Sequence, residues 1–217
     1  MVFVNSLQGN QTLAMIKTVL FDLGNVLVQF SHEKMYRQLG DVCGISSESM
    51  CQLLDDTQLY HSLELGKMEA SEFVESLQAQ LGKELDRDSV IQAGSDIFTP
   101  LEGMGTIIDR LSSAGIRTVL ISNTCRAHFE HVQKSFSVLE RLDDFVLSFE
   151  VGYRKPAHEI YQAAKQKIEC DPAECLYVDD IREFVETGKS LGFQGHVFTG
   201  PLEFSQCLQS HGLSGIE

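Results

Sequence analysis

The segment Ile16-Lys-Thr-Val-Leu-Phe21 is a nearly unbroken apolar run that stops at Asp22-Leu-Gly-Asn25. Such a run, followed at once by an acid and a glycine, is typical of a strand buried on both faces of a parallel sheet. Four later stretches are apolar runs that also end at small or polar residues, and they cover residues 116–121, 145–149, 175–178 and 195–198. The sequence therefore predicts about five parallel strands.

Segments with helical periodicity separate these predicted strands. Apolar residues recur every three or four positions in residues 101–111, 157–168 and 181–191. Gly115 is placed to end the first helix, Pro156 suits the first turn of the second, and Gly188 allows the third to approach the sheet. The alternation of strand and helix predicts an α/β fold with a doubly wound, Rossmann-like parallel sheet.

Residues 31–100 interrupt the alternation because they carry only helical signals. We therefore expect a discontinuous α/β core, residues 16–30 and 101–217, with a helical cap inserted at 31–100. Hinges are expected near Ser31 and Thr99-Pro100. The polar residues of the insertion that are candidates for contact with a ligand are Arg37, Tyr60, His61 and Lys67.

The composition is that of a globular protein. Of the 217 residues 43% are hydrophobic, and 17 Lys and Arg stand against 31 Asp and Glu, which gives a formal charge of −14 that repels nucleic acids and anionic membranes. The N-terminal stretch up to Met15 lacks the basic start of a signal peptide, and no apolar run is long enough to span a membrane. Six cysteines without a Cys-x-x-Cys pair suit reduced thiols. We expect a cytoplasmic monomer or homodimer that binds neither nucleic acid nor membrane.

Polar residues follow three of the predicted strands, at the edge where parallel sheets bind ligands: Asp22, Ser122 and Asp179-Asp180. Each alone has a structural explanation, as a turn residue or a helix cap. Together with Lys155, three carboxylates at one sheet edge are costly to hold unless a metal and an anion bind there. Carboxylate oxygens suit magnesium, and Lys155 would then face a phosphate.

In order and spacing these segments resemble the four motifs of the haloacid dehalogenase (HAD) superfamily. They read Phe21-Asp-Leu-Gly-Asn-Val-Leu27, Leu120-Ile-Ser-Asn-Thr124, Gly152-Tyr-Arg-Lys-Pro156 and Leu176-Tyr-Val-Asp-Asp180. The resemblance spans residues 16–198, and the insertion is similar to the cap domain of that family. The Asp-Leu-Gly-Asn opening, with His128 after the second motif, most resembles bacterial sugar-phosphate phosphatases. His128 and His131 share one helix face, which we expect to be exposed to solvent.

The resemblance implies a magnesium-dependent phosphomonoester hydrolase that acts on a small phosphorylated metabolite, such as a sugar phosphate, through an aspartyl phosphate on Asp22. It implies that Asp22, the backbone carbonyl of Gly24 and Asp180 hold Mg²⁺, with Asp179 behind them. It further implies that the phosphoryl oxygens are bound by Ser122, Lys155, Asn123 and the amides of Leu23 and Gly24.

One departure from the family pattern falls at Gly24, where most phosphatases of the family carry a second aspartate that serves as general acid and base. General acid and base catalysis typically contributes about 10²- to 10⁴-fold in rate. Glycine supplies no proton, so we expect a slow enzyme, an acid from another position that replaces the missing aspartate, or another reaction. A substrate with a good leaving group, such as a sugar 1-phosphate or an acyl phosphate, would need protonation least.

Two other functions stay open at this stage. A metal-free 2-haloacid dehalogenase uses the same aspartate and needs no acid at position 24, although it has little use for the pair Asp179-Asp180. A non-catalytic binding protein with the HAD fold could also have lost its chemistry through Gly24. Retention of Asp22, Ser122 and Lys155 speaks against the second alternative, because buried charges without a role reduce stability. The sequence does not identify the substrate, the replacement acid or the specificity residues of the cap.

Overall fold

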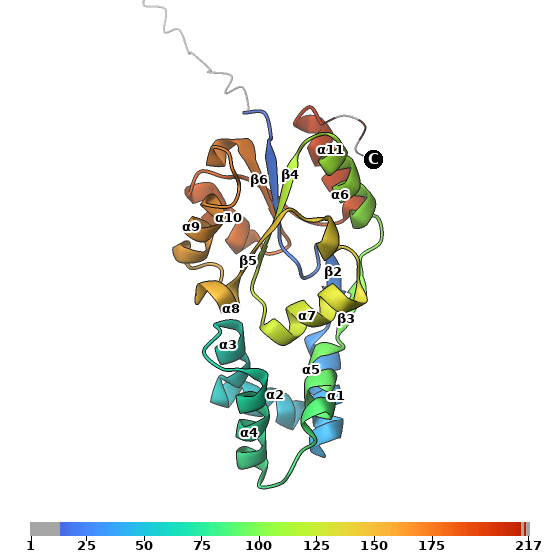
Figure 1. Ribbon diagram of the computed structural model, residues 1–217, viewed down its shortest axis with the longest axis vertical. Coiled ribbons are helices and arrows are strands. Elements are labelled where there is room, and N and C mark those ends of the chain that lie inside the picture. The colour runs from blue at the N-terminus through green and yellow to red at the C-terminus, as the bar shows by residue number, and fades with distance from the viewer. Residues whose placement is uncertain (1–13, 214, 216–217) are drawn as a thin grey trace, which may run out of the picture.

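The computed structural model describes residues 14–213 and 215, and a five-stranded parallel sheet lies at its centre (Figure 1). The strands run in the order β5-β4-β1-β6-β7, and each pairs in parallel with its neighbours. Their bounds are β1 Thr18–Phe21, β4 Arg117–Ser122, β5 Asp144–Leu147, β6 Cys175–Asp179 and β7 Gln194–Val197. The predicted doubly wound sheet is confirmed.

Helices cover both faces of the sheet, as the strand sequences require. In β1, Val19 and Phe21 pack into one hydrophobic cluster while Leu20 packs into the other, and all three are fully buried. The first cluster is completed by helices α6 (Met104–Ser113), α7 (Arg126–Ser135) and α11 (Pro201–Ser210). The second is completed by α9 (His158–Lys165), with α10 (Arg182–Ser190) packed beside it. A strand that is apolar at successive positions is explained by this burial on both sides.

Five helices form a second layer beyond the carboxyl ends of the strands, and we call it the helical layer (Figure 1). They are α1 His32–Cys43, α2 Ser47–Thr57, α3 Leu59–Glu64, α4 Ala70–Leu81 and α5 Arg87–Ser95. The chain passes to and from this layer through β2 (Val28–Phe30) and β3 (Phe98–Pro100), which pair antiparallel. The two crossing segments therefore lie side by side.

The structure differs from the sequence predictions at several boundaries. The third run, residues 145–149, ends earlier than predicted, because Ser148–Val151 form the short helix α8. Pro156 lies outside the second predicted helix, in a turn in which the Ala157 N–H bonds the Arg154 carbonyl at 2.8 Å. The pair β2–β3 and the helix α3 were not predicted. Gly188 behaves as predicted, since a Cβ built there would lie 2.6 Å from Cδ1 of Tyr177.

Within the described ranges, no helix is both long and apolar enough to cross a membrane. The prediction that the stretch up to Met15 is not a signal peptide concerns mainly residues 1–13, which lie outside those ranges.

Candidate active site

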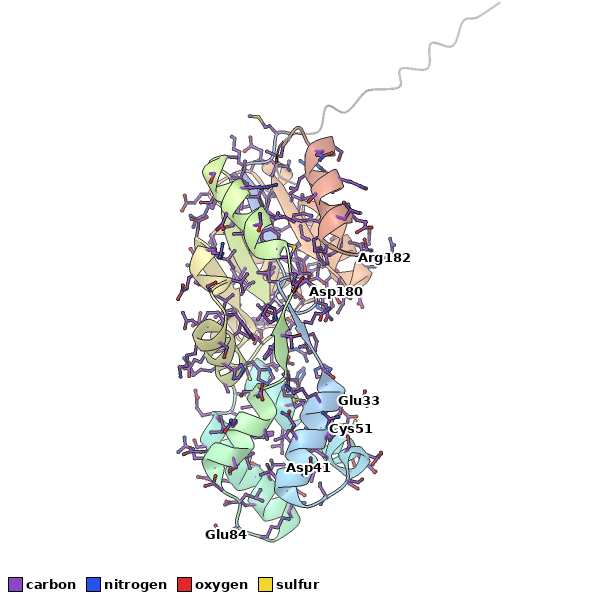
Figure 2. The ribbon with its side chains drawn as sticks, turned by 90° about the vertical axis from the view of Figure 1, so that its right-hand side faces the viewer. Glu33, Asp41, Cys51, Glu84, Asp180 and Arg182 are labelled. Atoms are coloured by element: carbon purple, nitrogen blue, oxygen red, sulfur yellow. The ribbon has the colours of Figure 1, made fainter. Side chains whose placement is uncertain are left out.

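Three adjacent strands bring the predicted polar residues to one edge of the sheet. Asp22 directly follows β1, Ser122 ends β4 on one side of it, and Asp179 ends β6 on the other. All three are buried. Asp180, the next residue, lies near the junction of the sheet and the helical layer, whereas Glu33 lies on the helical layer itself (Figure 2). The order of the strands thus assembles residues that are far apart in the sequence.

Lys155 lies between two of these carboxylates. Its Nζ donates to Oδ1 of Asp22 and to Oδ2 of Asp179, both at 2.6 Å, and to the carbonyl of Ile121 at 3.2 Å. The Lys155 side chain is only 1% exposed. Its backbone is fixed by Asn123, whose side-chain amide exchanges two hydrogen bonds with the Lys155 N–H and C=O at 2.7 and 3.0 Å. The second and third predicted motifs therefore act together to place one ammonium group against Asp22.

Asp22, Asp179 and Asp180 each offer one carboxylate oxygen, and these oxygens all lie within 4.8 Å of one another. The three acids differ in the hydrogen bonds that they accept from other residues. Asp179 accepts from Lys155 and Tyr177 on Oδ2 and from the Ile181 N–H on Oδ1. Asp180 accepts at Oδ2 from the Asn25 side chain at 3.1 Å. A set of hard oxygen donors of this kind fits Mg²⁺.

Burial and mutual repulsion shift the protonation equilibria of the cluster. Burial raises the pKa of Asp22 to about 7, with Asp179 adding to the rise and Lys155 opposing it. Burial also raises the pKa of Asp180, and the bond from Asn25 opposes that rise. For Lys155, burial alone would lower the pKa, but the two neighbouring carboxylates raise it, so the ammonium stays charged. One lysine thus faces more negative charge than it neutralises, which favours the binding of a cation.

A cleft of about 170 Å³ opens beside Asp22, and we call it the Asp22 cleft. Its lining residues come from the strand ends, the loops after them and the helical layer. They include the predicted residues Asp22, Leu23, Gly24, Ser122, Asn123, Lys155 and Asp180, together with Asn25, Phe30, His32, Tyr60, Glu64, Phe98, Thr124, His128, Arg154, Ile181 and Phe184. Asp179 is fully buried behind this surface.

The ring of Phe30 fills the space where a side chain at position 24 would lie. A Cβ built on Gly24 would be 2.6 Å from Cε1 and 2.8 Å from Cδ1 of that ring. The Phe30 ring is itself held by edge contacts with His32, at 4.9 Å between centroids, and by Phe98 at 6.3 Å. Any larger residue at position 24 would therefore have to displace the Phe30 ring of β2.

The helical layer contributes several groups that the sequence analysis did not select. Glu64, at the end of α3, is 5% exposed and lies 3.0 Å from Nε of Arg154 in the loop before Lys155. Burial raises the pKa of the Glu64 carboxyl, and Arg154 opposes that rise. Of the polar residues predicted for this layer, Tyr60 lines the cleft and His61 contacts Arg154, while Arg37 and Lys67 are exposed and do not line it.

The prediction of a solvated face for His128 was wrong. His128 is buried, with Nε2 at 2.9 Å from the carbonyl of Gly94 in α5 and Nδ1 at 3.4 Å from the hydroxyl of Tyr60. Burial lowers the pKa of this histidine, which favours the neutral ring. It thus connects α7 to two helices of the helical layer.

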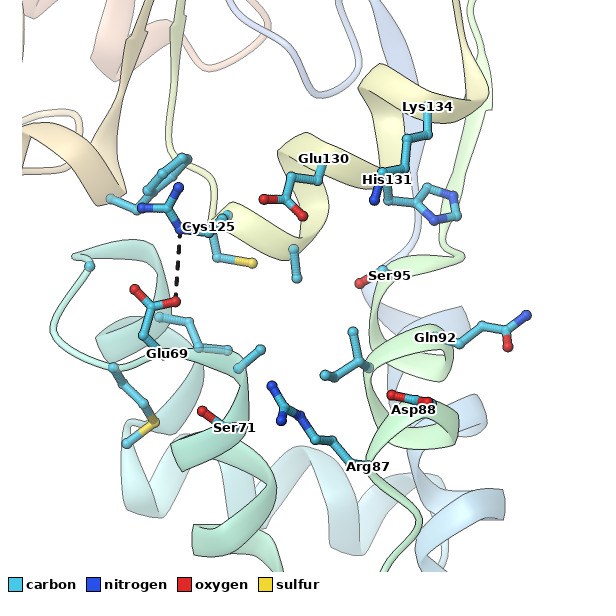
Figure 3. A pocket seen from close by; sticks show the side chains of 18 residues that line it. Glu69, Ser71, Arg87, Asp88, Gln92, Ser95, Cys125, Glu130, His131 and Lys134 are labelled. Atoms are coloured by element: carbon cyan, nitrogen blue, oxygen red, sulfur yellow. Dashed lines mark ion pairs between the residues drawn. The ribbon is translucent and has the colours of Figure 1, made fainter.

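A larger cavity of about 520 Å³ lies between α7, α4 and α5, and it does not contain Asp22 (Figure 3). Glu130, His131 and Lys134 of α7 line one side of it, and the ion pair of Glu69 with Arg126, at 3.8 Å, crosses it. Cys125 also lines this cavity, but burial raises the pKa of its thiol to about 12, so it is no ready nucleophile. Asp22, Asp180 and Lys155 line the smaller Asp22 cleft instead.

The chain is similar to several known proteins. It is 28% identical, over 83% of its length and 90% of the relative's, to a D-ribitol-5-phosphate phosphatase of Bacteroides thetaiotaomicron. A HAD family enzyme of the same organism, solved in complex with magnesium and inorganic phosphate, superposes with a TM-score of 0.74 at 22% identity and covers 85% of this chain and 95% of its own.

A second solved fold neighbour is the L-2-haloacid dehalogenase of Xanthobacter autotrophicus, with a TM-score of 0.59, 20% identity, and coverage of 83% of this chain and 76% of its own. The family model for haloacid dehalogenase-like hydrolases matches residues 16–192, which include all four motifs. The chain therefore belongs to the haloacid dehalogenase-like hydrolase family and is a hydrolase.

Proposed function

We propose that the protein is a magnesium-dependent phosphomonoester hydrolase that acts on a small phosphorylated metabolite, such as a sugar phosphate, through a covalent aspartyl phosphate. The observation that carries this proposal is the geometry of Asp22, which lies at the carboxyl edge of the sheet with Lys155 at 2.6 Å and two further acids beside it. The 28% identity to a sugar-alcohol phosphatase supports the same reaction class.

Asp22 acts as the nucleophile in this mechanism. An oxygen of its carboxylate attacks phosphorus in line, the bond from phosphorus to the ester oxygen breaks, and the alcohol leaves after it takes up a proton. Water then attacks phosphorus, the bond to Asp22 breaks, and inorganic phosphate is released with the carboxylate restored. The charge balance of both steps depends on cations near the phosphoryl group.

The phosphoryl oxygens are bound by groups from the same sheet edge. Lys155 supplies the fixed ammonium, and Ser122 and Asn123 supply side-chain donors next to it in the Asp22 cleft. The backbone amides of Leu23 and Gly24, in the loop that follows Asp22, donate to the same phosphoryl group. Donors that are already fixed in a largely buried site stabilise developing charge without reorganisation.

Asp22, the backbone carbonyl of Gly24 and Asp180 would hold Mg²⁺, and Asp179 would orient Lys155 from behind. Both oxygens of Asp179 are already engaged by Lys155, Tyr177 and a backbone amide, which suits a supporting role. When bound, Mg²⁺ supplies positive charge that shields the anionic nucleophile from the anionic phosphate.

The helical layer serves as a cap in this proposal, with residues 31–100 as the cap and residues 16–30 and 101–217 as the core. It contributes Tyr60 and Glu64 to the Asp22 cleft, so the alcohol part of the substrate meets cap residues while the phosphate meets the core. The absence of an acid at position 24 makes the release of a poor leaving group slow.

Release of p-nitrophenol from p-nitrophenyl phosphate, with Mg²⁺ or with EDTA, tests this function. We expect metal-dependent turnover that Asp22→Asn lowers by more than about 10³-fold. The matched control is Asp41→Asn, the same change at an exposed acid of α1 (Figure 2), which should leave turnover unchanged. Release of chloride from 2-chloropropionate in EDTA would instead favour the dehalogenase, and no turnover of either substrate would favour a binding protein.

A further inference from the structure

Glu64 and Arg154 form an ion pair in which Glu64 is buried and Arg154 is partly exposed. Arg154 Nε lies 3.0 Å from Glu64 Oε2, and the two side chains are 32% and 6% exposed. Neither of these two atoms has a hydrogen-bond partner of good geometry among the described residues, although both atoms are inaccessible to solvent. Because these two atoms face each other, the pair can offer a ligand the other carboxylate oxygen of Glu64 and the remaining N–H groups of the partly exposed Arg154.

The pair lies where the alcohol part of a bound phosphate ester would extend. Glu64 and Arg154 line the same cleft as Asp22 and Lys155, but Glu64 comes from the helical layer opposite the sheet edge. The cleft, at about 170 Å³, is smaller than the roughly 300–1,000 Å³ of typical drug-sized sites. A cleft of this size favours a small alcohol.

The chemistry of the surrounding residues favours an uncharged alcohol with several hydroxyl groups. Arg154 balances the charge of Glu64, so this end of the cleft offers no net charge for a second anionic group. A carboxylate accepts hydrogen bonds from hydroxyls and a guanidinium donates to them. The rings of Phe30 and Phe98 line the same cleft and can cover the C–H faces between the hydroxyls.

We propose that Glu64 and Arg154 select the substrate by binding hydroxyl groups of the leaving alcohol, so that the preferred esters are phosphates of small neutral polyols or sugars. This proposal rests on the proposed phosphatase function. It assigns Glu64 a role in substrate binding rather than in proton transfer, because the carboxylate is held in an ion pair with Arg154 at 3.0 Å.

Esters that share a carbon skeleton and differ in hydroxyls test this assignment. Glycerol 3-phosphate and D-ribitol 5-phosphate are compared with propyl and pentyl phosphate, with p-nitrophenyl phosphate as a common reference. We expect the wild-type protein to prefer at least one hydroxylated ester over its matched alkyl ester by more than about 10-fold in kcat/KM. Loss of a hydrogen bond to a charged group corresponds to about 10- to 150-fold. Glu64→Gln should lower kcat/KM for the preferred ester by that factor, chiefly through KM, and by much more than for its matched alkyl ester or p-nitrophenyl phosphate.

The control is Glu75→Gln, the same change at an exposed position of α4, which should leave all five rates unchanged. Inhibition of p-nitrophenyl phosphate hydrolysis by the free polyol gives a second readout, and its inhibition constant should rise in Glu64→Gln. An equal loss for all esters would show a purely structural role for Glu64, and a loss for every alkyl and polyol ester with p-nitrophenyl phosphate spared would show a general acid. Either result overturns the assignment. Absence of metal-dependent turnover in the wild-type protein overturns the phosphatase function itself, whereas turnover without preference for hydroxyls overturns only this inference.

Discussion

Replacement of Lys155 by methionine removes the only cation that separates Asp22 from Asp179 in the described site. At 2.6 Å and an effective dielectric constant of about 20, each contact with the ammonium is worth about 6 kcal/mol before desolvation. Desolvation of the buried lysine offsets most of that gain. Removal of one partner from a buried ion pair nonetheless costs about 3–5 kcal/mol, because the remaining charges stay buried. We expect Lys155→Met to reduce the free energy of unfolding by this amount.

Urea unfolding followed by circular dichroism, with EDTA present, measures this loss. The matched control is Lys167→Met, which removes an exposed lysine that pairs with Asp144 at 3.1 Å. Surface ion pairs contribute about 0–1 kcal/mol, so the control should change little. A loss below about 1 kcal/mol for Lys155→Met, no larger than that of the control, would refute the view that this lysine holds the acid cluster together.

Three further predictions concern packing and protonation. Gly24→Asp should not give a fast phosphatase, because the added Cβ meets the Phe30 ring at 2.6 Å. The same change should lower the free energy of unfolding by about 1–3 kcal/mol, measured by urea unfolding, and Phe30→Ala should partly recover that loss. Gly188→Ala should cost a similar amount through its contact with Tyr177. Burial lowers the pKa of His128 below its unfolded value, so the contribution of the neutral ring to stability is present above pH 6.5 and is lost as the pH falls. The free energy of unfolding of His128→Gln should therefore fall less between pH 7 and pH 5 than that of the wild-type protein.

Each of these results has a matched comparison. Gly105→Ala changes a helical glycine whose added Cβ meets only ordinary contacts, the nearest at 3.6 Å, and should be neutral or stabilising. Equal stability of Gly188→Ala and Gly105→Ala would contradict the close approach of α10 to the sheet. For His128, the comparison is His158→Gln at an exposed position of α9, which should keep the wild-type pH profile. A fast Gly24→Asp single variant would show that the Phe30 ring moves aside at little cost.

The sequence was sufficient to predict the sheet and the core of the site. A strand that is apolar at every position has to be covered on both faces, and a polar residue directly after it has to lie at the sheet edge. This logic brought Asp22, Ser122 and Asp179 to neighbouring strands, and the structure places them there. It needed no information on how the side chains contact each other.

The contribution of the helical layer could not be predicted in the same way. Glu64 belongs to a helix of six residues, too short for a periodic pattern, and its partner Arg154 is about 90 positions away in the chain. Burial of His128 likewise depends on contacts with Gly94 and Tyr60, which are made only when the two layers pack. The aromatic ring that replaces a side chain at position 24 gives no local signal either. Long-range packing determines all of these features.

The antiparallel pairing of β2 with β3 places both ends of the inserted helices next to each other, because facing residues in such a ladder are about 4.5–5.5 Å apart. The inserted helices are therefore anchored at one point, from which their sequence can vary without shifting the two strands that carry them. Under the proposed function, variation in these helices would change the residues that contact the alcohol and leave Asp22 and Lys155 at the sheet edge in place. The course of the backbone through β2 and β3 thus separates a variable helical layer from a constant sheet edge.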